Sequence, residues 1–150
     1  MANKNIVSEF VRNNLDGDPD PDAIPRMSRM LYVDRSITNI DIKNSTYADR
    51  TALQYQSGYG TTGSVAWLLR QDPPAGVNIG DSDQWTPLMD AVYSGVEDPE
   101  GKVRLLLDHG ADRDIKDSFG YTALDKARNH NKPNPEVIDM LENYRPDVSR

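Results

Sequence analysis

Apolar residues recur along this chain in a two-part pattern that appears three times. The first part is threonine, alanine or proline, and leucine, and it starts at Thr51, Thr86 and Thr122, which are 35 and 36 residues apart. The second part places three apolar residues at i, i+3 and i+4, which is one face of an α-helix. These sets are Val65-Leu68-Leu69, Val103-Leu106-Leu107 and Val137-Met140-Leu141. A two-part pattern at nearly constant spacing predicts a repeat protein.

The second copy predicts the structure of one unit. Thr86 can cap a helix, the proline after it fits the first helical position, and Gly95 is expected to end that helix in the left-handed conformation. We expect a second helix over 102–108, with Gly110 as the left-handed residue beyond it. The polar stretch 111–120 then predicts an extended loop with a turn. Each unit is therefore helix, turn, helix and hairpin-like loop.

Residues 105–112 (LLLDHGAD) and 120–124 (GYTAL) resemble the second helix, loop and first helix of the ankyrin repeat family, whose period is about 33 residues. The resemblance covers about residues 40–144. It implies an all-α fold, an ankyrin repeat solenoid of stacked helix-turn-helix units with hairpin-like loops. The histidine that usually follows Thr-Pro-Leu is replaced by Gln54, Met89 and Asp125, which leaves open whether its hydrogen bonds between repeats are kept.

We expect a single domain over 1–150, since the repeats run through most of the chain. Its predicted parts are N-terminal capping helices (3–36), repeat 1 (37–80), repeat 2 (81–116), a C-terminal capping repeat (117–144) and a tail (145–150). The chain is 37% apolar and 27% charged, a composition that suits a thin, elongated stack. Capped at both ends, such a stack is expected to be a monomer.

Charge and composition narrow the function. The net charge of −7 argues against binding a nucleic acid backbone, which requires a basic stripe, and against an anionic membrane. Cysteine is absent, so no disulfide or thiolate metal site is expected. No apolar run is long enough for a signal peptide or a membrane span. We therefore expect a soluble, cytoplasmic protein.

The stretch 58–63 (GYGTTG) matches the spacing of a dinucleotide-binding loop, and Asp83 lies 20 residues beyond its last glycine. That mechanism requires a strand before the glycines, whereas the repeat pattern predicts a helix there. We interpret the stretch as a glycine-rich turn between paired helices, and we predict no cofactor.

The segment 16–22 brings four aspartates together and suggests a calcium loop. An EF-hand loop needs glycine at its sixth position and glutamate at its twelfth, but these positions hold Pro21 and Met27. We interpret the segment as a solvated acidic loop and predict no metal site.

No motif of an enzyme is present. Neither a Gly-X-Ser-X-Gly nor a His-Glu-X-X-His pattern occurs, and we expect the carboxylates to lie on helix exteriors and loops, in solvent. No catalytic residue is predicted.

The resemblance implies a partner-binding surface at the loop tips and the exposed ends of the first helices, on a concave face. The corresponding positions are Tyr59, Ser82, Asp83, Trp85, Tyr93, Ser94, Ser118, Phe119, Tyr121, Asn129 and His130. Five of these are aromatic, and aromatic side chains are favoured as interface anchors. The alternative is that some of them, Phe119 and Tyr121 in particular, only brace adjacent loops. We expect Trp67, on a second helix, to pack in the core.

The predicted function is a non-catalytic module that binds another protein, with acidic residues selecting a basic patch on that partner. An inhibitor or immunity-type protein that blocks a basic enzyme or toxin shares the same fold and remains an alternative. A third alternative is an enzyme whose site uses the inserted loops 16–22 or 97–101.

Overall fold

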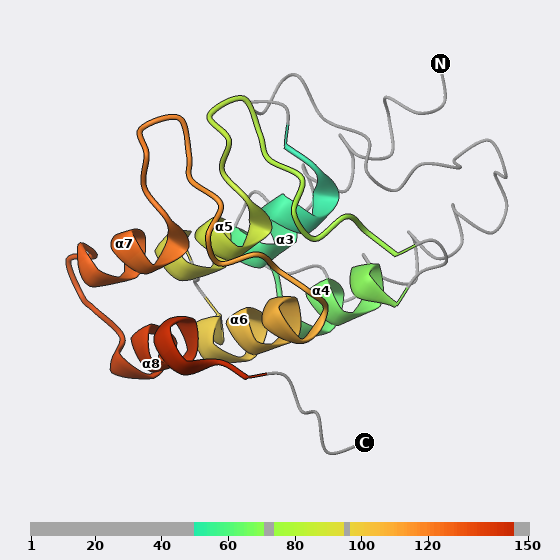
Figure 1. Ribbon diagram of the computed structural model, residues 1–150. Coiled ribbons are helices and arrows are strands. Elements are labelled where there is room, and N and C mark those ends of the chain that lie inside the picture. The colour runs from blue at the N-terminus through green and yellow to red at the C-terminus, as the bar shows by residue number, and fades with distance from the viewer. Residues whose placement is uncertain (1–49, 71–73, 95–96, 146–150) are drawn as a thin grey trace, which may run out of the picture.

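The computed structural model of the protein describes residues 50–70, 74–94 and 97–145 (Figure 1). In these ranges the chain forms six helices and no strand. They are α3 (Ala52–Tyr59), α4 (Thr62–Leu69), α5 (Pro87–Ser94), α6 (Pro99–Asp108), α7 (Ala123–Arg128) and α8 (Pro135–Asn143). The expected capping helices of 3–36, the acidic loop 16–22, Gly95 and most of the tail lie outside the described residues.

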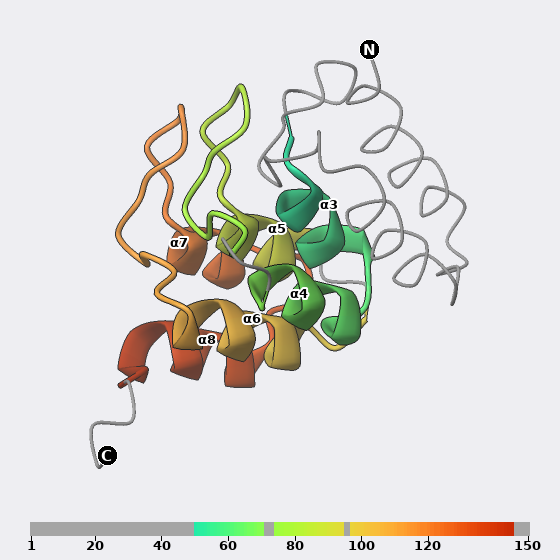
Figure 2. The ribbon, with the colours of Figure 1, turned by 90° about the vertical axis from the view of Figure 1, so that its right-hand side faces the viewer.

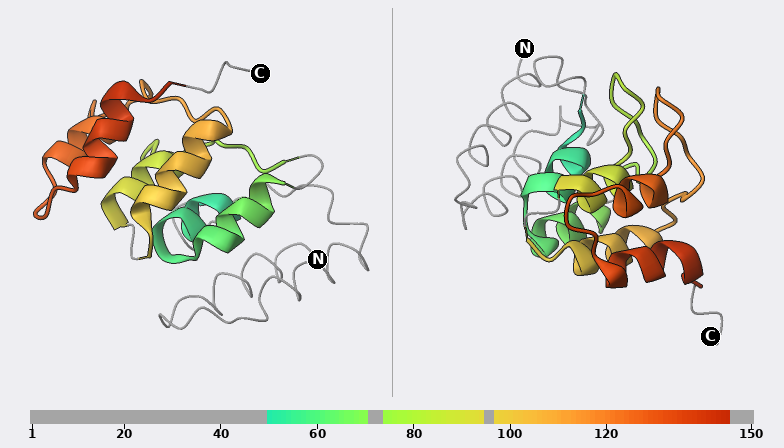
Figure 3. Two further views of the ribbon diagram at one scale, coloured as in Figure 1. Left: turned by 90° about the horizontal axis from the view of Figure 1, so that it is seen from below. Right: turned by 90° about the vertical axis from the view of Figure 1, so that its left-hand side faces the viewer.

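The helices form two layers of three (Figure 3). In one layer α5 packs between α3 and α7, and in the other α6 packs between α4 and α8. Each helix of the first layer also contacts the helix that follows it in the chain. Two hairpins project from the side of the first layer, next to each other and in the same direction (Figure 2). This arrangement confirms the all-α prediction of stacked helix-turn-helix units with hairpin-like loops.

Threonine side chains start the first helices, as the sequence predicts. Thr51 and Gln54 form a capping box at α3, in which each side chain accepts a hydrogen bond from the backbone amide of the other. Thr122 and Asp125 form the same box at α7. Such reciprocal pairs satisfy amides that have no partner within the helix. The repeated threonine therefore marks where each first helix begins.

Helix α6 begins at Pro99, three residues before the start that the sequence predicts. Asp98 caps this helix from a left-handed conformation, with φ of 44°, and accepts a hydrogen bond from the Gly101 amide. Proline suits the first helical position because its missing amide is not needed there. The prediction was wrong because it treated 99–101 as part of an insertion between the helices rather than as a helical turn.

The predicted apolar positions of the second helices form the core. Val65, Leu68, Val103 and Leu106 are completely buried between the two layers. In α8, Val137 and Leu141 are buried, whereas Met140 is only partly buried against the core. Trp67 also packs partly buried against this core, as expected.

The glycine-rich stretch contains the turn between α3 and α4. The residues before the turn form helix α3 rather than a strand, and Thr61 caps α4 after it. Gly58 lies where α3 and α5 approach closely, since a Cβ atom there would stand 3.4 Å from the Cβ of Ser94. The turn between paired helices is thus confirmed, but it consists only of residues 60–61, because 58–59 belong to α3 and 62–63 to α4.

Candidate functional site

The two projecting hairpins have the same internal structure. In the first, the Asp81 amide donates a hydrogen bond to the Trp85 carbonyl at 3.0 Å, and in the second the Asp117 amide donates to the Tyr121 carbonyl at 2.9 Å. Gln84 and Gly120 occupy the equivalent left-handed position, with φ of 62° and 85°. We call residues 81–85 and 117–121 the hairpin tips.

One aspartate organises each hairpin tip. Asp81 Oδ1 accepts hydrogen bonds from the amides of Asp83 and Trp85, at 2.9 and 3.0 Å. Asp117 Oδ1 accepts in the same way from the amides of Phe119 and Tyr121, both at 2.9 Å. Such side-chain bonds to amides two and four residues ahead fix a tight turn. The tips are thus held by their own aspartates rather than by a partner.

The second oxygen of each aspartate pairs with a cation. Asp81 Oδ2 lies 3.3 Å from Arg50 Nε, and Asp117 Oδ2 lies 2.6 Å from Lys126 Nζ. Both carboxylates are almost completely buried. Burial alone would raise the pKa of Asp117, but the hydrogen bonds from Lys126 and from the two tip amides lower that pKa below its usual value.

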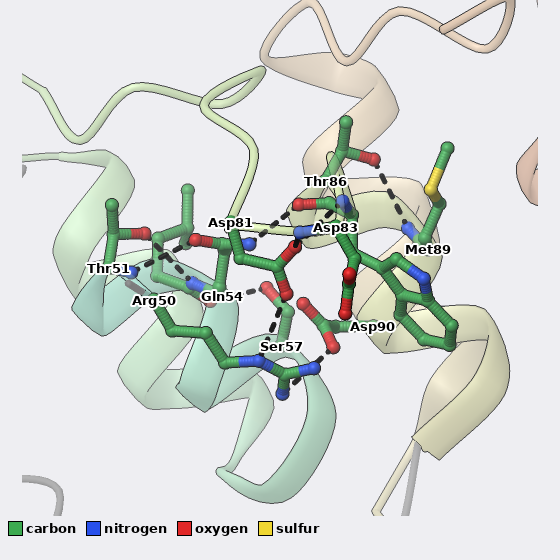
Figure 4. Close-up of polar contacts among 11 residues, drawn as sticks. Arg50, Thr51, Gln54, Ser57, Asp81, Asp83, Thr86, Met89 and Asp90 are labelled. Atoms are coloured by element: carbon green, nitrogen blue, oxygen red, sulfur yellow. Dashed lines mark hydrogen bonds and ion pairs between the residues drawn. The ribbon is translucent and has the colours of Figure 1, made fainter. Parts of the chain in front are cut away.

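Arg50 also contacts a third carboxylate, Asp90 of α5. The distance from Arg50 Nη1 to Asp90 Oδ1 is 3.1 Å, and Figure 4 shows the guanidinium between the carboxylates of Asp81 and Asp90. The contact lacks hydrogen-bond geometry, so neither oxygen of Asp90 accepts a hydrogen bond from a described residue. Burial raises the pKa of Asp90 to about 7, and the nearby charge of Asp81 adds to this while Arg50 and Lys126 oppose it.

These three aspartates correct one expectation from the sequence. Asp81, Asp90 and Asp117 are buried, whereas we expected the carboxylates to be solvated on helix exteriors and loops. A buried carboxylate requires hydrogen bonds or a cation, and two of the three have both. Asp81 and Asp117 each stand five positions before the threonine of their unit, but the sequence gives no sign of their cations.

Gln54 takes over the role of the histidine that the resemblance implies. Its Nε2 donates a hydrogen bond of 2.7 Å to the Trp85 carbonyl, so α3 is bonded to the hairpin of the next unit (Figure 4). Met89 is buried and apolar, and Asp125 is used in the capping box of α7. One of the three replacements therefore keeps a bond between units.

Trp85, the last residue of the first hairpin tip, packs next to α7. Its ring meets Tyr93 edge to face at 5.3 Å between centroids, and Lys126 Nζ lies 4.0 Å from its centroid. Lys126 is also 5.8 Å from the Tyr121 ring. A cation over an aromatic face is attracted by the ring. Trp85 is half-buried and braces one hairpin against the neighbouring unit.

Four other aromatic residues of the first helices and the hairpin tips are exposed. The exposed fractions are 75% for Phe119, 53% for Tyr93, 50% for Tyr121 and 47% for Tyr59. Among the described residues these are all the exposed large hydrophobic side chains. Every one of them is a position that the resemblance implies for partner binding.

The remaining predicted positions surround these aromatic residues. Ser82, Asp83, Ser118 and Asn129 are exposed, and Ser94 and His130 are half-buried. The His130 ring contacts Tyr93 edge to face at 5.7 Å, and its Nε2 lies 3.2 Å from the Tyr93 carbonyl. The Ser118 amide donates a hydrogen bond of 2.9 Å to the Asp83 carbonyl, which joins the two tips. The surface is therefore continuous across two units.

Residues 83–118 match the family model described as Ankyrin repeat. The chain contains an ankyrin repeat. The matched residues begin within the first hairpin tip and include α5, α6 and the start of the second tip. The matched ankyrin repeat confirms the family that the sequence resembles. A comparison with curated proteins found no match.

Ankyrin repeats generally mediate contacts between proteins and are typically non-catalytic. In the described part of the chain, no three histidine or acidic residues are grouped so that they could hold a metal ion. No helix there has the length and apolar character needed to cross a membrane.

The second helix of the matched ankyrin repeat contains a buried lysine that the sequence analysis missed. Lys102 is completely buried, and its Nζ has no hydrogen-bond partner in the described structure. Burial lowers the pKa of Lys102 to about 8, although Glu97 and Asp98 oppose this. The sequence analysis placed this residue only at the start of a predicted helix, and lysine is seldom completely buried.

Replacing Lys102 with methionine is expected to stabilise the protein by about 1–3 kcal/mol at neutral pH, because it removes an unpaired buried charge. The unfolded chain binds more protons than the folded one between about pH 8 and 10.5, so the stability of the wild type rises with pH in this window. The advantage of Lys102→Met should therefore shrink there. Urea unfolding at several pH values measures it.

Arg104→Met, an exposed position in the same helix, serves as the matched control. Its effect on the free energy of unfolding should stay below about 0.5 kcal/mol. A Lys102→Met variant that is less stable than the wild type at neutral pH would show that the ammonium group has a partner.

Proposed function

We propose that this protein is a non-catalytic module that binds another protein through its concave face, the surface formed by α3, α5, α7 and the hairpin tips. The observation that carries the proposal is the placement of the exposed aromatic side chains. All four that are exposed among the described residues belong to α3, α5 or the second hairpin tip. Aromatic residues at such positions supply large contact area at little loss of conformational freedom.

The preformed shape of the surface supports the same proposal. Asp81 and Asp117 hold the tips, and Lys126 and Trp85 brace them against the helices. A surface that is already ordered loses little entropy on binding, which favours affinity. Trp85 and Lys126 therefore act as supports, whereas Phe119, Tyr93, Tyr121 and Tyr59 are the proposed anchors.

The charge of the surface favours a basic partner. Asp83, Asp112 and Asp114 are exposed at or near the tips, while Lys126 and Arg50 are each paired with carboxylates. The charged side chains that remain free to contact a partner are therefore mainly carboxylates. Complementary charge speeds encounter and makes it sensitive to salt. We propose that the partner is another protein with a basic patch, bound by a cytoplasmic monomer.

The double variant Phe119→Ala/Tyr93→Ala tests this proposal. Each anchor is expected to contribute about 2 kcal/mol or more, so loss of both should weaken binding about a thousandfold. Affinity capture from the native cell extract identifies the partner, and titration of the purified partner measures the change in Kd. The far-ultraviolet circular dichroism should not change, because both side chains are mostly exposed.

Arg104→Ala is the control, since this exposed residue lies on α6, in the other layer. It should bind the captured protein as the wild type does. Equal affinity of the aromatic double variant and the wild type would remove the concave face from the proposal.

A further inference from the structure

Beneath the concave face, two buried carboxylates share a single cation. Arg50 is shared by Asp81 and Asp90, at 3.3 and 3.1 Å (Figure 4). The Arg50 side chain is 21% exposed, whereas the Asp90 carboxylate is completely buried. When both acids are ionised, Arg50, Asp81 and Asp90 together carry a net charge of −1. One of the two carboxylates is therefore the natural place for a proton.

The hydrogen bonds decide which carboxylate takes the proton. Asp81 Oδ1 accepts two backbone amides, which favour its ionised form. Asp90 accepts none from the described residues. The other charged group that acts on Asp90 is Lys126 of α7, and it is already paired with Asp117. A proton on Asp90 therefore displaces no hydrogen bond, and burial raises the pKa of Asp90 to about 7.

We propose that Asp90 is a proton-sensitive switch beneath the concave face. When it is ionised, Arg50 is divided between Asp90 and Asp81, and the face carries one more negative charge for a basic partner. When it is protonated, Arg50 pairs with Asp81 alone and the attraction for a basic partner falls. The partner-binding part of this inference rests on the proposed function, whereas the proton-dependent change in Arg50 pairing does not.

The proposed switch makes partner binding depend on pH. A basic partner favours the ionised form of Asp90, so binding releases a proton near neutral pH. Each unit by which the partner lowers the Asp90 pKa corresponds to a tenfold change in affinity. We expect the affinity for a basic ligand to rise about three- to tenfold between about pH 6 and 8. The imidazole of His130 lies near Tyr93 on the same face, so the variant Asp90→Asn is needed to isolate the effect of Asp90.

The first experiment follows the titration by NMR in the free protein. The side-chain carbon of Asp90 should titrate near pH 7, and the Asp83 and Trp85 amides, which bond to Asp81, should shift with it. In Asp90→Asn the shifts of these amides near neutral pH should disappear. An Asp90 carbon that titrates near its ordinary value of 3.8 overturns the inference, and so do amides that do not follow it.

The second experiment measures binding of a capped oligoarginine peptide, whose charge is constant because arginine does not titrate. The rise in affinity with pH should be present in the wild type and largely absent in Asp90→Asn. Asp114→Asn removes an exposed acid that is not one of the two carboxylates paired with Arg50, so it should weaken binding at both pH values and keep the rise. An equal rise in Asp90→Asn and the wild type overturns the inference.

Peptide that binds at neither pH would overturn the basic partner, and with it that part of the proposed function. The NMR titration would still decide for or against the switch. The two proposals can therefore fail separately.

Discussion

Replacing Leu106 with alanine is expected to lower the free energy of unfolding by about 2–5 kcal/mol, the range for removing a buried leucine side chain from a packed core. Leu106 is 0% exposed and lies in α6, which contacts α4 on one side and α8 on the other. The cavity would therefore weaken two interfaces between units. In a stack this short, neighbouring interfaces supply much of the stability, so the described helices should unfold together.

Urea unfolding followed by circular dichroism measures the loss. Leu105→Ala is the matched control, because it makes the same change at the preceding, half-buried position. We expect its cost to be less than half that of Leu106→Ala, since less surface leaves the core. Equal costs at the two positions would contradict the placement of Leu106 between the units.

Replacing Asp117 with alanine is expected to cost about 3–5 kcal/mol, as is typical when one partner of a buried ion pair is removed. The change leaves the Phe119 and Tyr121 amides without their acceptor and the Lys126 ammonium without its carboxylate. Thermal and urea unfolding measure the loss, and one-dimensional NMR of the tip amides reports whether the hairpin is still formed.

The variant Asp117→Asn separates the turn from the ion pair. Its amide oxygen can still accept both tip amides, so it should lose less stability than Asp117→Ala. Because the folded-state pKa of Asp117 is lowered, its contribution is present above the unfolded value of 3.8 and is lost as pH falls through the folded pKa. The gap between the wild type and Asp117→Asn should therefore close in acid, whereas Asp117→Ala still lacks the acceptor for the tip amides. A gap between the wild type and Asp117→Asn that persists in acid would contradict the ion pair.

The helices could be predicted from the sequence because their signals are local. Three apolar residues on one helical face mark each second helix, and a threonine caps α3 and α7. The start of α6 could not be predicted in the same way. Asp98 adopts a left-handed conformation that aspartate seldom adopts, and Gly101 is a poor helix former. The segment therefore looked like an insertion.

The candidate site could be predicted only in part. Periodicity and the family resemblance placed Phe119, Tyr93, Tyr121 and Tyr59 on one surface, and all four are exposed there. Whether they bind a partner is a proposal. The supports of this surface depend on contacts between distant residues. Asp81 pairs with a cation 31 positions earlier, whereas Asp117 pairs with one 9 positions later, so no repeating interval reveals either pair.

Arg50 and Lys126 stand on opposite sides of the carboxylates that they neutralise in the chain. The two ends of the stack should therefore respond differently to deletion. Arg50 precedes α3 and reaches forward to carboxylates of the next unit, whereas Lys126 neutralises a carboxylate that lies just before its own helix. A deletion from the N-terminal side through Arg50 would leave two neighbouring anions that repel each other. A deletion from the C-terminal side through α7 and its hairpin would remove an anion together with its cation, and it would uncover the apolar faces of α5 and α6 that α7 and α8 cover. Salt screens repulsion between anions. Added salt should therefore restore more stability after the N-terminal deletion than after the C-terminal deletion.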